Sequence, residues 1–359
     1  MFTLIISFMK TYQSFYLFAV VIILLSCESN SKKKSSLLAN DAPNGMIWVA
    51  QKTFMMGARS DDKMAMSREK PSHSVTVSGF YIDETEVTNA QFRKFINETK
   101  YLTVAERPID WNEMKKQLPA GTQKPHDSLL KPGSLIFNKN LKAVASMDNY
   151  YQWWTWKTGA NWKQPYGEGT NIDRKDNFPV VHVSYEDALA YCKWANRRLP
   201  TEAEWESAAL GTKTSSIFTW GNDVSKLNEM ANTWQGVFPV KNQSMDGFEY
   251  ISPIKSFPAN SIGIYDMTGN VWELTSDWFH INYYQQIVGK KLVNPKGATE
   301  SYNPQNPYQK EKVMKGGSFL CHESYCASFR ISARMASAMD TGSDHLGFRT
   351  VATQKMLKN

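Results

Sequence analysis

The chain has 359 residues, a formal net charge of +7, 13% aromatic residues and 4 cysteines. Its positive residues are dispersed, and beyond Lys32-Lys33-Lys34 there is no basic run with interleaved aromatic residues, so we expect no nucleic-acid binding. Trp, Tyr, Gly, Asn and Pro are scattered along the chain, and long helical periodicities are scarce. This pattern excludes a helical bundle and a regular α/β sheet, and it favours a loop-rich fold held by aromatic packing.

The N-terminal segment has the features of a targeting signal. Residues 15–26 are almost wholly apolar, but the run is shorter than the about 20 residues that a membrane-spanning helix needs. We therefore predict that residues 1–26 are a signal peptide. The following Leu24-Leu25-Ser26-Cys27 resembles a bacterial lipobox, in which cleavage leaves the cysteine lipidated. An uncleaved anchor helix is the alternative.

Residues 27–44 are rich in Ser, Lys and Asn and have few large apolar side chains. Such a segment cannot bury enough surface to fold, so we predict a flexible tether. Residues 45–353 are predicted to form the folded domain, and 354–359 a tail. With lipid on Cys27, the protein is expected to be exported and to be held at a membrane by its anchor alone. We expect a monomer.

Local patterns predict several elements in the folded domain. Residues 45–49 and 54–57 are predicted to pair as a hairpin, and residues 73–83 to form one strand. Three helices are predicted where a hydroxyl side chain can cap the first turn, and they begin at Thr88, Ser184 and Thr201. Residues 106–177 are irregular, and we favour packed core over an exposed binding platform for their clustered tryptophans.

Cys321 and Cys326 are the sharpest chemical signal in the chain. Residues five apart point to opposite faces of a strand, so the two sulfurs converge only if His322 to Tyr325 make a turn. Convergent thiolates select Cu(I), zinc or iron–sulfur clusters, but the 6 histidines show no paired spacing for zinc. Spacing alone favours a disulfide over copper. Cys192 lies in an apolar helical pattern that is typical of a buried structural thiol.

Two segments rich in side-chain oxygens are candidates for calcium or for ordinary Asx turns. Asn232–Gly236 with Asp246–Phe248 is one, and Asp266–Glu273 is the other. Each combines oxygens with turn residues that expose carbonyls, which calcium accepts, but neither has the EF-hand spacing. The residues by themselves favour turns.

Across residues 45–353 the chain resembles the formylglycine-generating enzymes that activate sulfatases. The resemblance rests on blocks in family order: Phe178–Ser184, Arg198–Glu206, Phe218–Asn222, Asn232–Gly236, Gly269–Glu273, Asn294–Gly297, Lys315–Cys326 and His345–Arg349. Most of these blocks recur across a wider superfamily and indicate only the fold. The Cys-His-x-Ser-Tyr-Cys block separates the catalytic members from relatives that share the scaffold.

The resemblance implies an α+β fold, a C-type-lectin-like variant with low regular secondary structure. It also implies an activity: oxygen- and copper-dependent oxidation of the cysteine in a Cys-x-Pro-x-Arg motif to Cα-formylglycine, in unfolded segments of exported sulfatases. Cys321 and Cys326 would hold Cu(I), and Ser318, His322 and Arg334 would line the catalytic pocket. A non-catalytic scaffold or binding lipoprotein of the same superfamily is the alternative.

The resemblance further implies two calcium sites. Asn232, Asp246 and the carbonyls of Thr233 and Phe248 would form one, and Asp266, Glu273 and the carbonyls of Gly269 and Val271 the other.

The chain departs from animal members of the family in its disulfides. Thr350 stands at the partner position of Cys192, and Ala209 and Ile331 replace a second bridge. We therefore expect Cys192 to be a free, buried thiol.

Overall fold

Residues 41–358 are the part of the chain that the computed structural model describes. The signal peptide, Cys27 and most of the tether lie outside this range. The chain divides into residues 1–44 and residues 45–359, and the second unit is the one described below. Within residues 41–358, no helix is both long enough and apolar enough to cross a membrane.

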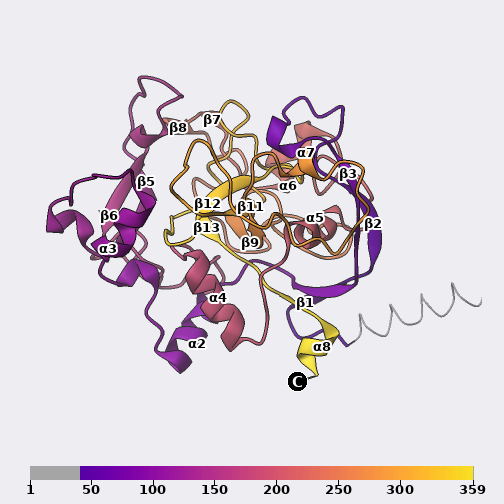
Figure 1. Ribbon diagram of the computed structural model, residues 1–359, viewed down its shortest axis with the longest axis horizontal. Coiled ribbons are helices and arrows are strands. Elements are labelled where there is room, and N and C mark those ends of the chain that lie inside the picture. The colour runs from indigo at the N-terminus through magenta and orange to yellow at the C-terminus, as the bar shows by residue number, and fades with distance from the viewer. Residues whose placement is uncertain (1–40, 359) are drawn as a thin grey trace, which may run out of the picture. The chain divides into compact units, whose positions relative to one another are not determined.

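A four-stranded sheet lies at the centre of the folded unit (Figure 1). Its order is β12–β11–β9–β13, with β9 antiparallel to β11 and parallel to β13. The bounds of these strands are β9 Trp272–Trp278, β11 Glu311–Lys315, β12 Met335–Ala338 and β13 Leu346–Gly347. The segment with Cys321 and Cys326 connects β11 to β12, so the central sheet fixes both of its ends.

Two three-stranded sheets form from the N-terminal strands and later segments. One has the order β1–β4–β14 and the other β10–β3–β2. Their bounds are β1 Met46–Val49, β2 Lys52–Met56, β3 His73–Val77, β4 Phe80–Asp83, β10 Leu292–Val293 and β14 Val351–Ala352. The predicted hairpin is wrong, because β1 pairs with β4 and β2 pairs with β3.

The predicted single strand over residues 73–83 is also wrong. It breaks between β3 and β4, which belong to different sheets. A Cβ atom at Gly79 would collide with the ring of Trp48, so this glycine lets the chain pass the indole as it changes sheets.

The three predicted helices are confirmed. They are α2 Asn89–Thr99, α4 Tyr185–Trp194 and α5 Glu202–Leu210, each with a capping box at its start. The remaining α-helices are single turns: α3 Trp111–Met114, α6 Leu227–Met230, α7 Tyr283–Gln286 and α8 Gln354–Leu357. The 3-10 helices cover Ser67–Glu69, Val104–Glu106, Lys115–Gln117, Asp127–Leu130, Tyr150–Gln152 and Val224–Lys226. The predicted tail therefore contains a helical turn.

The irregular segment 106–177 carries a hairpin of β5 Gly133–Phe137 and β6 Trp154–Thr158. The hairpin lies at the left of Figure 1, and the β2–β3 pair lies at the opposite side. A second short ribbon pairs β7 Gly236–Val237 with β8 Lys241–Asn242. Trp153 is fully buried, as predicted for core, whereas Trp156 in β6 is 37% exposed.

Cys192 is free and buried, as predicted. Thr350 donates its hydroxyl hydrogen to Asp83 Oδ2 at 2.6 Å. Asp83 also forms an ion pair with Arg197 at 2.6 Å. A polar network therefore occupies the place where the resemblance puts a disulfide partner.

Candidate active site

The connection between β11 and β12 brings the two cysteines together. The carbonyl of His322 accepts the N–H groups of Tyr325, Cys326 and Ala327 at 3.0, 3.0 and 3.1 Å. The predicted turn is therefore confirmed. The sulfurs of Cys321 and Cys326 lie 2.7 Å apart as free thiols, with 2% and 8% of each residue exposed.

Backbone contacts fix the position of Cys321. Ser318 donates its N–H to Cys321 Sγ at 3.4 Å, and its carbonyl accepts the N–H of Cys321 at 2.8 Å. Gly317, with a φ of +74°, leaves no room for a Cβ atom against the backbone of Ser328. The glycine thus permits the close turn that places Ser318 under the thiols.

The two thiols differ in acidity. Burial and the neighbouring Cys326 raise the pKa of Cys321 well above its ordinary value. Burial opposes ionisation of Cys326 as well, but hydrogen bonds, the largest of them from Cys321, lower its pKa. The first proton therefore leaves the pair from Cys326. A thiolate is the form in which cysteine attacks substrates and binds metals.

Aromatic side chains form one wall beside the thiols. The ring of Tyr325 stacks on Phe238 with centroids 4.6 Å apart, and Trp153 meets it edge-on at 5.4 Å. Burial raises the pKa of Tyr325 to about 12, so its phenol stays protonated. This wall keeps water from one side of the pair.

Ser318 contacts Cys321 through its N–H, and His322 follows Cys321 in the turn. His322 is partly buried, and its Nδ1 is 2.8 Å from Ser324 Oγ within the same turn. Burial lowers the pKa of His322, so its ring is neutral at neutral pH. Ser318 has no exposed surface, and its Oγ lies 3.1 Å from Nδ1 of His345. His345 belongs to the last family block, but sequence reasoning gave it no role in the site.

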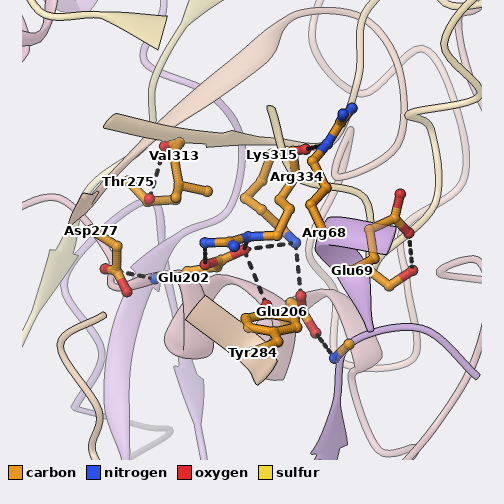
Figure 2. A network of polar contacts seen from close by, with 12 residues as sticks. Arg68, Glu69, Glu202, Glu206, Thr275, Asp277, Tyr284, Val313, Lys315 and Arg334 are labelled. Carbon is orange, nitrogen blue, oxygen red and sulfur yellow. Dashed lines mark hydrogen bonds and ion pairs between the residues drawn. The ribbon is translucent and has the colours of Figure 1, made fainter. Parts of the chain in front are cut away.

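The geometry does not support the catalytic role predicted for Arg334. Its guanidinium donates to both carboxylate oxygens of Glu202 at 2.8 Å, and Lys315 lies 2.7 Å from Glu206 beside it (Figure 2). All four side chains are buried, and in Figure 2 they face one another. Two N–H groups of this guanidinium are thus used in a buried, two-point ion pair, which indicates a structural role. The acidic start of α5 therefore does more than complement the helix dipole.

The first predicted calcium site contains oxygens that lack ordinary partners. Asn232 Oδ1 is buried and has no hydrogen-bond partner within the described residues. The carbonyl of Thr233 and Asp246 Oδ2 both accept from one amide group, Nε2 of Gln235. Phe248 joins the set through its N–H, which donates to Asp246 Oδ1 at 2.9 Å. The chemistry of this donor set fits a hard cation, because its members are oxygens and one of them is buried without a partner.

The second predicted site lies against the first. Asn270 donates its N–H to the carbonyl of Asn232 at 2.9 Å, and a Cβ atom at Gly269 would collide with that same carbonyl. Glu273 forms a two-point ion pair with Arg349 at 2.6 and 2.7 Å. Burial raises the pKa of Asp266 to about 6.

Glu86 is a further carboxylate at this second site, and sequence reasoning missed it. It is fully buried, and its Oε2 has no partner within the described residues. Burial, followed by repulsion from Asp266, raises its pKa. Arg349 acts on Glu86, Asp266 and Glu273 together. Burial therefore opposes ionisation of Glu86 and Asp266 beside Glu273 and Arg349, and a bound divalent cation would favour their charged forms.

Side chains alone do not complete either site. Between residues 41 and 358, no three His, Cys, Asp or Glu side chains are grouped closely enough to hold a metal by themselves. A cation would therefore depend on carbonyl and amide oxygens, such as those predicted for Thr233, Phe248, Gly269 and Val271. Such mixed oxygen sets are typical of calcium.

Comparison with solved structures gives the fold class. The chain is similar to "Structure of PvdO from Pseudomonas aeruginosa", with a TM-score of 0.57, 22% identity, and coverage of 85% of this chain and 93% of that one. Together with the low content of regular secondary structure, this confirms the predicted α+β fold. The thiol pair on this scaffold is the feature expected of the catalytic, formylglycine-generating class.

The chain belongs to the sulfatase-modifying factor enzyme 1-like family, whose profile matches residues 33–354. It is 40% identical over 311 residues to the formylglycine-generating enzyme of Mus musculus, with 86% of this chain and 74% of the relative covered. It is also 35% identical over 315 residues to the inactive C-alpha-formylglycine-generating enzyme 2 of Bos taurus, with 87% and 89% covered. This chain is thus similar both to a formylglycine-generating enzyme and to an inactive relative. Whether it is active must therefore be inferred from the residues of its site.

Proposed function

We propose that this protein is an active formylglycine-generating oxidase. It converts the cysteine of a Cys-x-Pro-x-Arg motif in an unfolded sulfatase segment to Cα-formylglycine, with O2 as oxidant. The observation that carries the proposal is the convergence of two free thiols, Cys321 and Cys326, 2.7 Å apart in a turn built for them. Family membership supports the reaction class but does not by itself separate active from inactive members.

The two thiols fit a single Cu(I) ion. They converge, hydrogen bonds lower the pKa of Cys326, and soft thiolates prefer this metal to calcium or magnesium. Copper would supply a centre at which the client thiolate and O2 meet. The chain's own residues then have simpler tasks, because the N–H of Ser318 orients Cys321 and the ring of Tyr325 excludes water.

The overall reaction fixes what the assay must contain. One client thiol, one O2, two electrons and two protons give one aldehyde, one hydrogen sulfide and one water. The two electrons come from a thiol reductant in solution. The client sulfur leaves as hydrogen sulfide, so the two cysteines of the enzyme are unchanged after a turnover.

We also propose the setting predicted from the sequence. The protein is exported, is anchored through lipid on Cys27 at the periplasmic side or cell envelope, and acts as a monomer on exported sulfatases. Calcium at one or both oxygen-rich sites stabilises the fold. The support for calcium is the unpartnered Asn232 Oδ1 and the three buried carboxylates, Glu86, Asp266 and Glu273, around Arg349.

The proposal is tested by incubating purified, Cu(I)-loaded protein with a Cys-x-Pro-x-Arg peptide and reductant in air. Mass spectrometry should show that the peptide exchanges its sulfur for an aldehyde oxygen. Cys321→Ser and Cys326→Ser should each abolish conversion. Cys192→Ala is the matched control, because this thiol is also buried but lies outside the site, and it should retain turnover. Intact peptide binding without conversion by the wild type would favour the alternative, a non-catalytic scaffold.

A further inference from the structure

His345 lies one side chain away from the thiol pair. Its Nδ1 is 3.1 Å from Ser318 Oγ, and the N–H of Ser318 donates to Cys321 Sγ. Ser318 has no exposed surface, whereas His345 is partly exposed. Ser318 therefore contacts Cys321 through its backbone N–H and His345 through its hydroxyl, and these two residues lead from the buried thiols toward the surface.

The loop that carries His345 is fixed to the β5–β6 hairpin. Ser134 Oγ donates to the carbonyl of Gly342 at 2.8 Å, and Asp344 Oδ2 accepts the N–H of Phe137 at 2.9 Å. The imidazole packs against the ring of Trp154, with centroids 4.7 Å apart. His345 is thus held in one orientation toward Ser318, as a preorganised site requires.

The hydrogen bonds of Ser318 Oγ favour proton transfer to the histidine. This oxygen accepts the N–H of Leu320 at 3.3 Å, so its own hydrogen is free to point at Nδ1 of His345. Burial and the neighbouring His182 lower the pKa of His345 to about 3, so its ring is neutral and relays a proton only if Nε2 releases one as Nδ1 accepts one. Its second nitrogen, Nε2, has no partner in the described part of the chain and is not sealed from solvent.

We propose that Ser318 and His345 form the proton exit route of this site. The inference rests on the proposed function, because the proton comes from the client thiol. The client S–H bond breaks, and its proton forms an O–H bond with Ser318. The former hydroxyl proton of Ser318 passes to Nδ1 of His345, and Nε2 releases its proton to water. No electrons move, and the client sulfur is left as a thiolate. His345 acts through Ser318: it orients the serine hydroxyl and takes up its proton, and it does not contact the client.

The first test separates proton relay from client binding. His345→Asn keeps a group that can hydrogen-bond to Ser318 but cannot carry a proton, and His345→Ala leaves space for free imidazole. Both should lower kcat on the order of 10²-fold, with KM within about twofold of wild type. Added imidazole should restore part of the kcat of His345→Ala and leave the wild type unchanged.

The matched control is His126→Asn. His126 is exposed, and its Nδ1 lies 2.9 Å from Ser128 Oγ in a similar histidine–serine pair away from the thiols. This variant should turn over like the wild type, and all variants should show wild-type melting temperatures. Retention of kcat by His345→Asn would overturn the relay. A raised KM with unchanged kcat would do so too, since it would assign His345 to client binding.

The second test needs no oxygen and so stands apart from the proposed oxidation. Anaerobic Cu(I)-loaded protein is mixed with the Cys-x-Pro-x-Arg peptide in a stopped-flow instrument containing a pH indicator. Wild type should release a proton, the matching Ser-x-Pro-x-Arg peptide should not, and His345→Asn should be slower by about tenfold or more. Equal rates, or no release by wild type, would overturn the route. Release that depends on His345 without aldehyde formation in air would instead refute only the proposed function.

Discussion

At the scale of single residues, several buried charges of this protein are paired across the chain. Arg334 and Lys315 share the carboxylates of Glu202 and Glu206, and Arg330 pairs with Glu69 at 2.6 Å. Each charge has lost its hydration, and only its partner compensates. Removing one partner therefore costs far more than the pair itself contributes.

Arg334→Met should destabilise the protein by about 3–5 kcal/mol, because it leaves Lys315 to balance the buried carboxylates of both Glu202 and Glu206. Urea unfolding at neutral pH measures this change. Lys116→Met is the control, since its ion pair with Glu113 is exposed on both sides and should contribute less than about 1 kcal/mol. If Arg334→Met keeps wild-type stability but loses turnover, Arg334 has a catalytic role and this prediction is wrong.

A second residue-scale prediction concerns Asp277, whose pKa burial raises to about 7. The unfolded chain releases this proton at about pH 3.9, so the folded state binds more protons between these values. Stability should therefore fall as pH rises from about 4 toward 8, by at most about 4 kcal/mol from this group.

Asp277→Asn should remove that part of the pH dependence. The stability of the variant relative to wild type should therefore increase from pH 5 to pH 8. The measurement is the free energy of unfolding in urea at both values. Asp173→Asn, at an exposed site, should leave the wild-type slope intact. Parallel slopes for Asp277→Asn and wild type would contradict the prediction.

At the scale of elements, short helices depend on their first turns. In α5, Thr201 Oγ1 accepts the N–H of Glu204 at 3.1 Å, and the Glu204 carboxylate accepts the N–H of Thr201 at 2.9 Å. Two N–H groups that the helix leaves unpaired are thereby satisfied. The same helix presents Glu202 and Glu206 to the buried ion network, so its start fixes their position.

Thr201→Ala should cost about 1 kcal/mol of stability, because it removes one half of the capping box. Thr201→Ser keeps the hydroxyl and serves as the matched control. Differential scanning calorimetry should rank the melting temperatures as wild type, then Ser, then Ala. An Ala variant equal to the Ser variant would show that the cap is not needed.

Prediction from sequence succeeded where the signal was local. The hydroxyls of Thr88, Ser184 and Thr201 each accept a backbone N–H only three residues further along the chain. The turn between the two cysteines also spans only a few residues. Strand partners depend on segments that lie further away in the chain. The sequence therefore predicted that β1 pairs with β2, whereas β1 pairs with β4 and β2 with β3.

The candidate site shows the same division. Its thiols lie in one short motif, but His345 and Glu86 reach their neighbours only through the fold. The ion pair of Arg334 could not be foreseen for the same reason, since Glu202 is 132 residues away in the chain.

At the scale of the whole molecule, the oxygen-rich loops join distant parts of the chain. Glu86 follows β4, Asn232 precedes β7, and Asp266 and Glu273 flank the start of the central sheet. Burial opposes ionisation of Glu86 and Asp266 at this junction, and a bound cation would favour their charged forms. Calcium would therefore act on the stability of the entire folded unit.

Calcium should raise the melting temperature, and a chelator should lower it. At about 100 times the dissociation constant, the expected stabilisation is about 2.7 kcal/mol per site. Asp246→Asn and Glu86→Gln should each weaken the response, whereas Asp173→Asn should not. A melting temperature that changes with neither calcium nor chelator would refute the proposal.

The hydroxyl of Thr350, bonded to Asp83 beside the free Cys192, has a practical consequence. None of the three cysteines in residues 41–358 takes part in a crosslink, so the folded domain needs no oxidative maturation. It can be produced in a reducing bacterial cytoplasm without a disulfide isomerase. The thiol reductant that supplies electrons in the assay will also leave its structure intact.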